Sequence, residues 1–288
     1  MASNEAARRP VVIVTGCSTG IGREAVQHLR KAGFLVVATA RRVDSILDLA
    51  ARGECEAHRL DVTDAAQRKT LIEDVLACHG RIDALVNNAG FGAVLAVEDT
   101  TPEAMRSMFD TNVFGLHELT RLVLPQMRKQ RSGRIVNVAS VAGHVSIPLL
   151  GAYCATKFAL RALTQALDNE VRQFGVRALL VEPGVIKTEF GSRSMAESRV
   201  AFGVHGDAKD HYAGSPYEGM YRRWERRRML RGGVHPDVIA KAIVRACASH
   251  APRFHNFAPF SAKMTNLAKR LLPDALIDAG MRAYFRAR

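Results

Sequence analysis

Short apolar runs alternate with segments of helical periodicity along most of this 288-residue chain. The run VVIVT at 11–15 is closed by glycines, which is typical of a buried parallel strand. Strand and helix alternate about six times, and this predicts an α/β fold with a doubly wound parallel sheet and helices on both faces. Further strands are predicted at 34–40, 57–61, 82–90, 134–140 and 176–184, with helices at 22–32, 43–52, 64–79, from 102 onward and between 140 and 176.

Capping residues mark where some of these helices begin. Thr63 is placed to cap the helix of 64–79. Thr101 and Pro102 open the next helix, because proline fits the first helical position. The spacing of Thr100 and Glu103 adds the pattern of a capping box.

The C-terminal third follows a different pattern. Residues 191–232 show little periodicity and many glycines, serines and charges, which is typical of a lid or binding loop. A helix is predicted at 236–249, and 260–288 read as two short helices broken at Pro273. We therefore expect a single domain over 1–288, with a core at 11–190, a substrate lid at 191–232 and C-terminal helices at 233–288.

The net charge of +13 leaves several kinds of partner open. The arginines are densest in YRRWERRRMLR at 221–231, which we interpret as a solvated helix face anchored by Trp224. A nucleic-acid surface would need more stacking aromatics, so no nucleic acid is expected. Weak docking of the protein on an anionic membrane through this segment and the C-terminal tail remains an alternative. The polar N-terminus, the lack of a long apolar run and five scattered cysteines predict a cytoplasmic protein without a metal site.

The segment TGCSTGIG at 15–22 is the first candidate site. It follows the first strand and opens the first helix, where backbone N–H groups and the helix dipole bind a nucleotide pyrophosphate. Its spacing, G-x-x-x-G-x-G, differs from the general dinucleotide fingerprint. The predicted cofactor contacts in this loop are Gly16, Ser18, Thr19, Gly20, Ile21 and Gly22.

The end of the second strand predicts which dinucleotide binds. A carboxylate there would bind the ribose 2′-hydroxyl of NAD, but this strand is followed by Arg41 and Arg42. Two guanidinium groups pair with a 2′-phosphate, so NADP(H) is favoured and NAD(H) stays possible. Asp61, which ends the third strand, is placed to accept from the adenine amino group or to cap the following helix.

Tyr153 and Lys157 lie four residues apart in a predicted helix and so share one face. A nearby ammonium favours the phenolate and would lower the tyrosine pKa. Ser140 ends a strand thirteen residues earlier, at the sheet edge where ligands bind. These residues form a candidate proton-transfer site, with Asn112 as a fourth member.

With TGxxxGIG, Asn87-Asn88-Ala89-Gly90, Tyr-x-x-x-Lys and Pro183-Gly184 in order over residues 11 to about 190, the chain resembles the short-chain dehydrogenase/reductase family. The resemblance implies a Rossmann fold and hydride transfer between a nicotinamide cofactor and a carbonyl or alcohol. Tyr153 would be the general acid or base, and Lys157 would lower its pKa and hold the nicotinamide ribose. Ser140 would bind the substrate oxygen, and Asn112 would hold a water linked to Lys157.

The resemblance also implies further cofactor contacts. Asn88 and Ala89 would lie against the adenine ribose, whereas Asn87 would brace the central sheet. The segment from Pro183 would meet the nicotinamide carboxamide. The full additional set is Asp61, Val62, Asn88, Ala89, Gly90, Tyr153, Lys157, Pro183, Gly184, Ile186 and Thr188.

A hydrophobic ketone, aldehyde or secondary alcohol is the expected substrate. VEPGVIKTEF, APRF and LLPD resemble the subgroup near 17β-hydroxysteroid and retinol dehydrogenases, although HNFAPF departs from it and puts a C-terminal strand in doubt. Relatives are usually dimers or tetramers. NAD(H)-linked alcohol oxidation and a catalytically silent dinucleotide sensor are the alternatives. His144 and His205 are more often structural than substrate contacts. The expected pocket residues are Val141, Val145, Leu149, Leu150, Phe190, Met195 and Phe202.

Overall fold

The computed structural model describes residues 9–51, 55–188, 190–203, 212–227 and 233–285. Its strands are β1 (Val11–Val14), β2 (Leu35–Ala40), β3 (Cys55–Arg59), β4 (Ala84–Asn87), β5 (Gly133–Val138), β6 (Val176–Pro183) and β7 (His255–Ala258). All pair in parallel in the order β3-β2-β1-β4-β5-β6-β7. The predicted doubly wound sheet is confirmed, and its order reverses between β1 and β4, where ligands bind in such folds.

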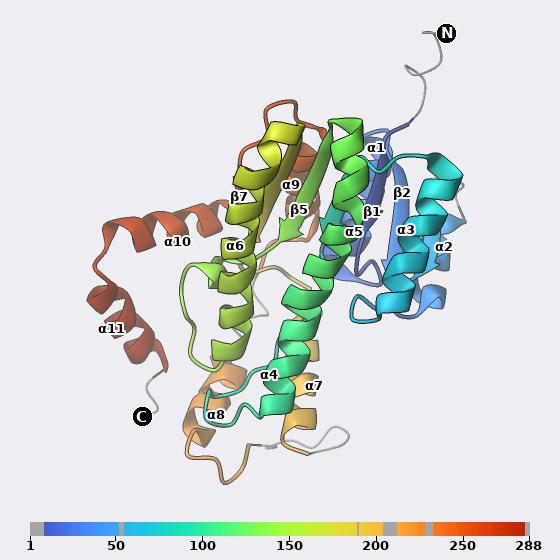
Figure 1. The fold of residues 1–288 in the computed structure, drawn as a ribbon. Helices are drawn as coiled ribbons and strands as arrows, with labels where there is room; N and C mark the ends of the chain where they lie inside the picture. Colours follow the sequence, from blue (N-terminus) through green and yellow to red (C-terminus); the bar gives the residue numbers. More distant parts are fainter. Residues whose placement is uncertain (1–8, 52–54, 189, 204–211, 228–232, 286–288) are drawn as a thin grey trace, which may run out of the picture.

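Helices cover both faces of the sheet, because successive strand residues point to opposite sides. In Figure 1, α5 and α6 lie in front of the strands and α9 lies behind them. One face packs against α1 (Gly20–Lys31), α2 (Leu47–Ala50) and α9 (Asp237–Ala248). The other packs against α3 (Ala65–His79), α5 (Gly115–Gln130) and α6 (Gly151–Val171).

One predicted helix cap is wrong by one residue and the predicted capping box is wrong, whereas Thr101 and Pro102 open their helix as predicted. Asp64, not Thr63, caps α3, and its carboxylate accepts from the Gln67 backbone N–H at 3.0 Å. Thr101 alone caps α4 (Pro102–Phe109), because the Thr100 hydroxyl turns back to the Ala96 carbonyl at 2.8 Å. In both cases the residue nearest the first helical turn makes the cap.

The predicted lid contains regular structure. Helices α7 (Phe190–Ala201) and α8 (Glu218–Arg227) lie in the segment where the sequence lacks periodicity. Tyr221 and Trp224 of α8 are only 1% and 5% exposed, so the predicted Trp anchor is confirmed, while 228–231 lie outside the described residues.

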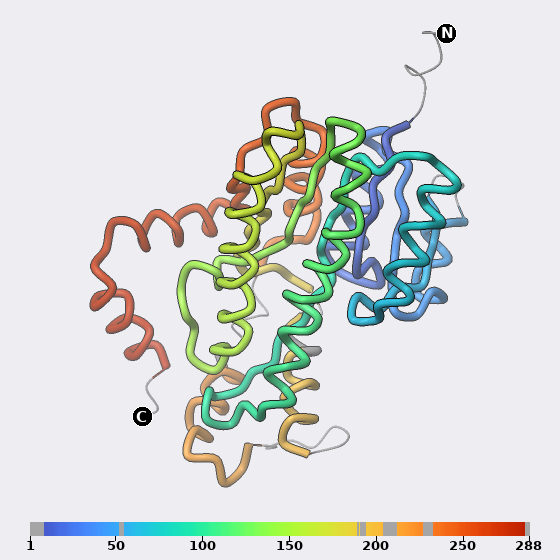
Figure 2. The backbone as a smooth tube through the Cα atoms, viewed as in Figure 1, coloured from blue at the N-terminus to red at the C-terminus, as the bar shows by residue number. Residues whose placement is uncertain are grey.

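The C-terminal elements follow the sequence pattern and add a strand. β7 pairs with β6 in parallel, so the doubt about a C-terminal strand is resolved in favour of one. The tail forms α10 (Phe260–Leu271) and α11 (Asp274–Phe285), which separate at Pro273 as predicted. The tube in Figure 2 shows both helices at the outer side of the molecule, beyond the sheet. None of the helices in the described part is long and apolar enough to span a bilayer.

Candidate active site

The glycine loop between β1 and α1 is shaped for close approach of an anion. Gly16 and Gly20 have φ values of 72° and 59°, in the left-handed region that glycine favours. A Cβ on Gly22 would lie 2.3 Å from the Gly16 carbonyl oxygen, so only glycine fits there. The Thr19 side chain does not cap α1, which leaves the first backbone N–H groups of the helix for a ligand. This loop therefore fits the pyrophosphate of a dinucleotide.

Thr15 and Asn88 fasten this loop to the end of β4. The Asn88 side-chain amide donates to the carbonyls of Thr15 at 2.9 Å and Gly16 at 3.1 Å. In return, the Thr15 hydroxyl accepts from the backbone N–H groups of Asn88 at 3.0 Å and Ala89 at 2.9 Å. The Asn88 side chain thus shapes the loop at the switch point of the sheet. Thr15 is a structural member of the site that the sequence analysis missed, although it begins the glycine motif.

The other predicted adenine-side residues are arranged around the ends of β2 and β3. Arg41 and Arg42 are exposed directly after β2, where they are free to turn toward a ligand. The Asp61 carboxylate accepts from the backbone N–H of Thr63 at 3.0 Å and from its hydroxyl at 2.7 Å. The carboxylate therefore also organises the turn into α3. Val62 is buried beneath this turn.

The segment after β6 returns to the glycine loop. A Cβ on Gly20 would lie 3.3 Å from the Thr188 side-chain methyl, so the two segments face each other across a short gap. The Thr188 hydroxyl accepts from the Phe190 backbone N–H at 3.2 Å and so connects this segment to α7. Ile186 forms an isolated bridge with Val234, which holds the segment in place. The predicted nicotinamide segment is thus beside the loop, as its role requires.

Asn112 lies in a π-helical turn (Asp110–Phe114) between α4 and α5. The helix is therefore distorted at Asn112. Its side-chain oxygen accepts from the Phe91 backbone N–H at 3.0 Å, and its amide donates to the Phe91 carbonyl at 2.8 Å and the Thr156 hydroxyl at 3.1 Å. A Cβ on Gly90 would lie 3.0 Å from Asn112 Oδ1 and 3.8 Å from Lys157 Nζ, so these three residues meet. The expected water link to Lys157 stays a prediction.

Tyr153 and Lys157 of α6 are both buried, at 9% and 5% exposure. Burial raises the pKa of the Tyr153 phenol, and a hydrogen bond with Ser140 opposes this only in part. Burial also lowers the pKa of Lys157 to about 8. Its ammonium donates to the Val138 carbonyl at 2.9 Å and lies 5.6 Å from the centre of the Tyr153 ring.

This geometry corrects the expected direction of the tyrosine pKa. Lys157 does not offset the burial of the phenol, because its Nζ is directed to the Val138 carbonyl. Tyr153 is therefore a protonated phenol near neutral pH. The neutral phenol is the form that donates a proton to a carbonyl oxygen.

A third hydrophobic cluster surrounds Tyr153 and combines the 93–96 loop, the start of α6 and helices α7 and α8. The Phe190 ring of α7 lies 5.2 Å from the Tyr153 ring, centre to centre. Val141 and Val145 lie outside this cluster, although Ala142, between them in the turn after Ser140, belongs to it. The predicted pocket residues that the cluster does bring together are Leu149, Leu150, Phe190, Met195 and Phe202.

Glu182, His144 and the partly exposed His255 form a group that the sequence analysis did not predict. Glu182 accepts from His144 at 2.5 Å through one carboxylate oxygen and pairs with His255 at 2.8 Å through the other. Despite complete burial, these hydrogen bonds hold the pKa of Glu182 below its usual range. The three residues offer a possible ligand set for a metal ion. Because one ring nitrogen of each histidine already bonds its own carboxylate oxygen, we interpret the group as a brace between β6, β7 and the turn after Ser140. His205 lies outside the described residues.

Asn87 has the structural role that was predicted for it. Its amide donates to the Thr120 hydroxyl at 3.0 Å and to the Asn137 side-chain oxygen at 2.8 Å. Asn137 in turn donates to Thr164 of α6 at 2.8 Å. This buried network connects β4, β5, α5 and α6 beneath the site.

The family model described as short chain dehydrogenase matches residues 10–198, which include the glycine loop, Asn112, Ser140, Tyr153 and Lys157. The chain belongs to this family. It is therefore an NAD(P)-dependent oxidoreductase. Among curated relatives, the 3-ketodihydrosphingosine reductase of Bacteroides thetaiotaomicron is 31% identical over 280 residues, covering 96% of this chain and 98% of the relative. Human retinol dehydrogenase 8 is 35% identical over 254 residues, covering 86% of this chain and 80% of the relative.

Solved structures agree with this assignment. A short-chain dehydrogenase from Streptomyces avermitilis is 34% identical, with a TM-score of 0.77 over 94% of both chains. A metagenomic short-chain oxidoreductase in complex with NADP is 27% identical, with a TM-score of 0.66 over 86% of this chain and 96% of that one. A short-chain dehydrogenase/reductase from Burkholderia phymatum in complex with NAD is 25% identical, with a TM-score of 0.77 over 94% of this chain and 95% of that one. Both dinucleotides thus occur among similar structures.

Proposed function

We propose that this protein reduces a hydrophobic ketone or aldehyde with NADPH. The observation that carries the proposal is the convergence of Ser140, Tyr153 and Lys157 at the sheet edge, beside a glycine loop that fits a pyrophosphate. The bound nicotinamide would supply the hydride. The side chains of the protein would position the substrate and the cofactor and transfer the proton.

Tyr153 is the proposed general acid. Its protonated phenol would donate to the substrate oxygen as negative charge develops there, and the Ser140 hydroxyl would stabilise the same oxygen. Burial keeps Tyr153 protonated, which is the form needed to donate a proton during reduction. Lys157, whose pKa of about 8 keeps it mostly charged at neutral pH, would bind the ribose hydroxyls and balance the charge left on Tyr153.

Arg41 and Arg42 support the preference for NADPH. They are exposed at the end of β2, and within the described residues neither of them forms an ion pair that would hold it away from a 2′-phosphate. The similar structures with NADP and with NAD leave both cofactors open, so the preference depends on these guanidinium groups.

The Arg41→Asp variant tests the cofactor preference. Loss of one charged hydrogen bond of about 2 kcal/mol, with added repulsion, should lower the ratio of kcat/KM for NADPH over NADH by roughly 30-fold or more. Lys31→Asp, on the exposed end of α1, is the matched control for the change in net charge. If the ratio of kcat/KM for NADPH over NADH is unchanged in Arg41→Asp, Arg41 does not bind the 2′-phosphate.

The cluster around Tyr153 supports a hydrophobic substrate. Leu149, Leu150, Met195 and Phe202 contribute apolar surface around it. Two relatives whose names refer to 3-ketodihydrosphingosine and to retinol agree with an apolar carbonyl or alcohol. A panel of steroid, retinoid, long-chain aliphatic and short polar carbonyls, followed by NADPH absorbance, tests this. Preference for the short polar members would contradict the assignment.

A further inference from the structure

The exposed face of α10 is apolar. Phe260, Met264, Leu267 and Leu271 follow the spacing of one helical face, and their side chains are 73%, 44%, 43% and 71% exposed. A surface helix of a globular protein normally turns such a face toward its core. An apolar stripe that points outward is instead a mark of an interaction site. We call these four residues the α10 stripe.

The side of α10 that faces the protein carries a small residue and a polar residue, whereas a surface helix ordinarily packs its large apolar side chains inward. Ala262 is 1% and Asn266 is 9% exposed. The Ala262 methyl would lie 3.3 Å from a Cβ on Gly184, which shows how closely the helix approaches the nicotinamide segment. Figure 1 shows α10 and α11 at the outer side of the molecule, next to β7 and α6. The stripe therefore faces away from the body of the protein.

Cations follow one edge of the α10 stripe. Lys263 and Arg270 each lie three residues after a stripe residue, Phe260 and Leu267, so both lie along the same edge of it. Both are exposed, and neither forms an ion pair with another of the described residues. This arrangement, an apolar face with cations beside it, is typical of helices that lie in a membrane interface.

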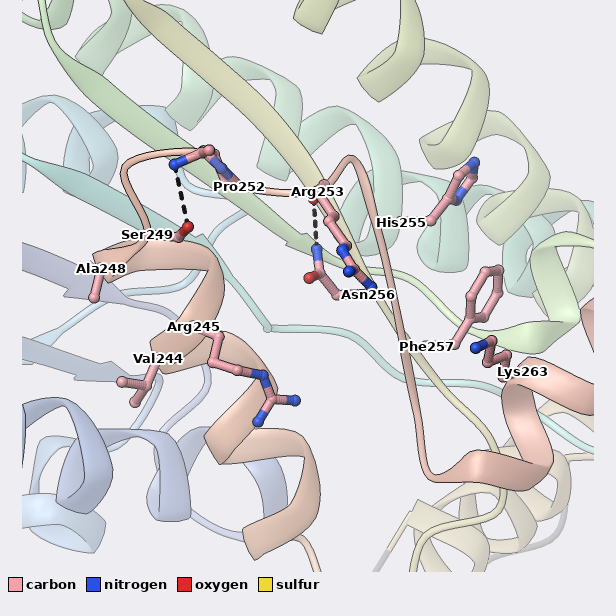
Figure 3. Close-up of a pocket in the computed structure, with 11 residues that line it drawn as sticks. Val244, Arg245, Ala248, Ser249, Pro252, Arg253, His255, Asn256, Phe257 and Lys263 are labelled. Carbon is pink, nitrogen blue, oxygen red and sulfur yellow. Dashed lines mark hydrogen bonds between the residues drawn. The ribbon is translucent and has the colours of Figure 1, made fainter.

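A basic groove continues from the same edge. It has a volume of about 600 Å³ and lies between the end of α9, β7 and α10. In Figure 3, Arg245 and Arg253 lie across it from Lys263, and His255 lines its upper part. The 11 residues drawn around it include no carboxylate and none of the predicted cofactor or catalytic residues. The groove therefore extends the positive surface beside the stripe and is separate from the active site.

We propose that α10 docks this protein on an anionic lipid surface, with the α10 stripe in the interface and Lys263, Arg270, Arg245 and Arg253 facing the headgroups. A second copy of the chain is the rival occupant of the stripe. The net charge of +13 opposes self-association at a cationic edge and favours a negative surface. The basic segment of α8 is not this surface, because Tyr221 and Trp224 are buried in the cluster around Tyr153.

The first test uses the full chain and vesicles of equimolar phosphatidylcholine and phosphatidylglycerol in a cosedimentation assay. Lys263→Gln/Arg270→Gln should lower the partition coefficient about 30-fold, from about 1 kcal/mol for each cation near an anionic surface. Lys31→Gln/Lys129→Gln removes the same charge from exposed sites on α1 and α5 and should have a small effect. Equal losses in both variants, or equal binding to pure phosphatidylcholine, would overturn the proposal.

The second test separates the lipid surface from a second copy. Leu267→Gln and Leu271→Gln should each weaken vesicle binding roughly tenfold, because each loses the burial of a leucine side chain. Val97→Gln, at a site 69% exposed, is the control outside α10. Sedimentation velocity without lipid should give the same species for the native chain and the stripe variants. A dimer that dissociates in the stripe variants, or vesicle binding that they do not change, would refute lipid docking at α10.

Discussion

Gly22→Ala is the sharpest test of the glycine loop. The new methyl would lie 2.3 Å from the Gly16 carbonyl oxygen and 2.5 Å from Asn88 Nδ2, closer than real Cβ contacts. Neither neighbour can easily move, because Asn88 is fixed by hydrogen bonds to the Thr15 and Gly16 carbonyls. The loop would have to open at the point where the pyrophosphate is expected.

The expected cost combines overlap and lost hydrogen bonds. Overpacking of a tight site costs about 1 to 3 kcal/mol, and each Asn88 bond contributes about 1 kcal/mol. We expect Gly22→Ala to lower the free energy of unfolding by about 3 kcal/mol and to weaken NADPH binding. Urea unfolding at equilibrium gives the first quantity, and NADPH fluorescence titration gives the second.

Gly280→Ala is the matched control. Gly280 lies inside α11, and a Cβ there meets nothing within 4 Å. Alanine should stabilise this helix by about 0.5 to 1 kcal/mol and leave cofactor binding unchanged. If Gly22→Ala unfolds at the urea concentration of the native chain and binds NADPH as tightly, the description of the loop is wrong.

Three further predictions follow from buried or capping groups. Burial lowers the Lys157 pKa from 10.5 to about 8, so the unfolded chain binds more protons than the native chain between these pH values. The free energy of unfolding of the native chain should therefore rise, relative to that of Lys157→Met, by up to roughly 3 kcal/mol from pH 7 to 10. Parallel pH profiles of the two unfolding free energies would contradict this. Because the pKa of Glu182 is lowered, its carboxylate stabilises the fold at pH values above the ordinary carboxyl pKa. Glu182→Gln should therefore lower the free energy of unfolding by about 3 kcal/mol near neutral pH and by progressively less on acidification. A loss of stability that does not depend on pH would disprove the brace. Thr101→Ala should lower the free energy of urea unfolding by about 1 kcal/mol through loss of the α4 cap. Glu103→Gln is the control and should have little effect. A larger effect of Glu103→Gln than of Thr101→Ala would instead support the Thr100–Glu103 capping box.

Much of the fold could be predicted because local signals and the global arrangement agree. Short apolar runs indicate buried parallel strands, and β1, β2, β4, β5 and β6 lie where such runs occur, whereas β3 is largely polar and only partly buried. The break at Pro273 separates α10 from α11 for the reason that the sequence suggests. Helix α7 was harder to predict, because it gains its order from packing around Tyr153 and not from a regular hydrophobic repeat.

The residues of the candidate site could be predicted from the sequence, but the hydrogen bonds and burial that set their pKa values could not. Asn112, Ser140, Tyr153 and Lys157 are brought together as their motif implies. The direction in which the Tyr153 pKa shifts could not be predicted from the spacing of Tyr153 and Lys157. It depends on the burial of the phenol and on the acceptor to which the Lys157 ammonium donates.

The Glu182 brace shows a different limit of sequence reasoning. His144 and His255 are more than a hundred positions apart and meet only through the β6–β7 pairing. The α10 stripe, in contrast, is readable as an amphipathic pattern, but only the structure shows that its apolar side faces outward.

The central claim is most directly tested by the Tyr153→Phe variant in the NADPH-dependent reduction of the best carbonyl substrate. The change keeps the ring against Phe190 and removes only the hydroxyl. We predict that kcat falls roughly a hundredfold or more while NADPH binding is retained, and that Tyr284→Phe in α11 keeps native activity. Native turnover in Tyr153→Phe would contradict proton transfer by Tyr153 and, with it, the proposed mechanism.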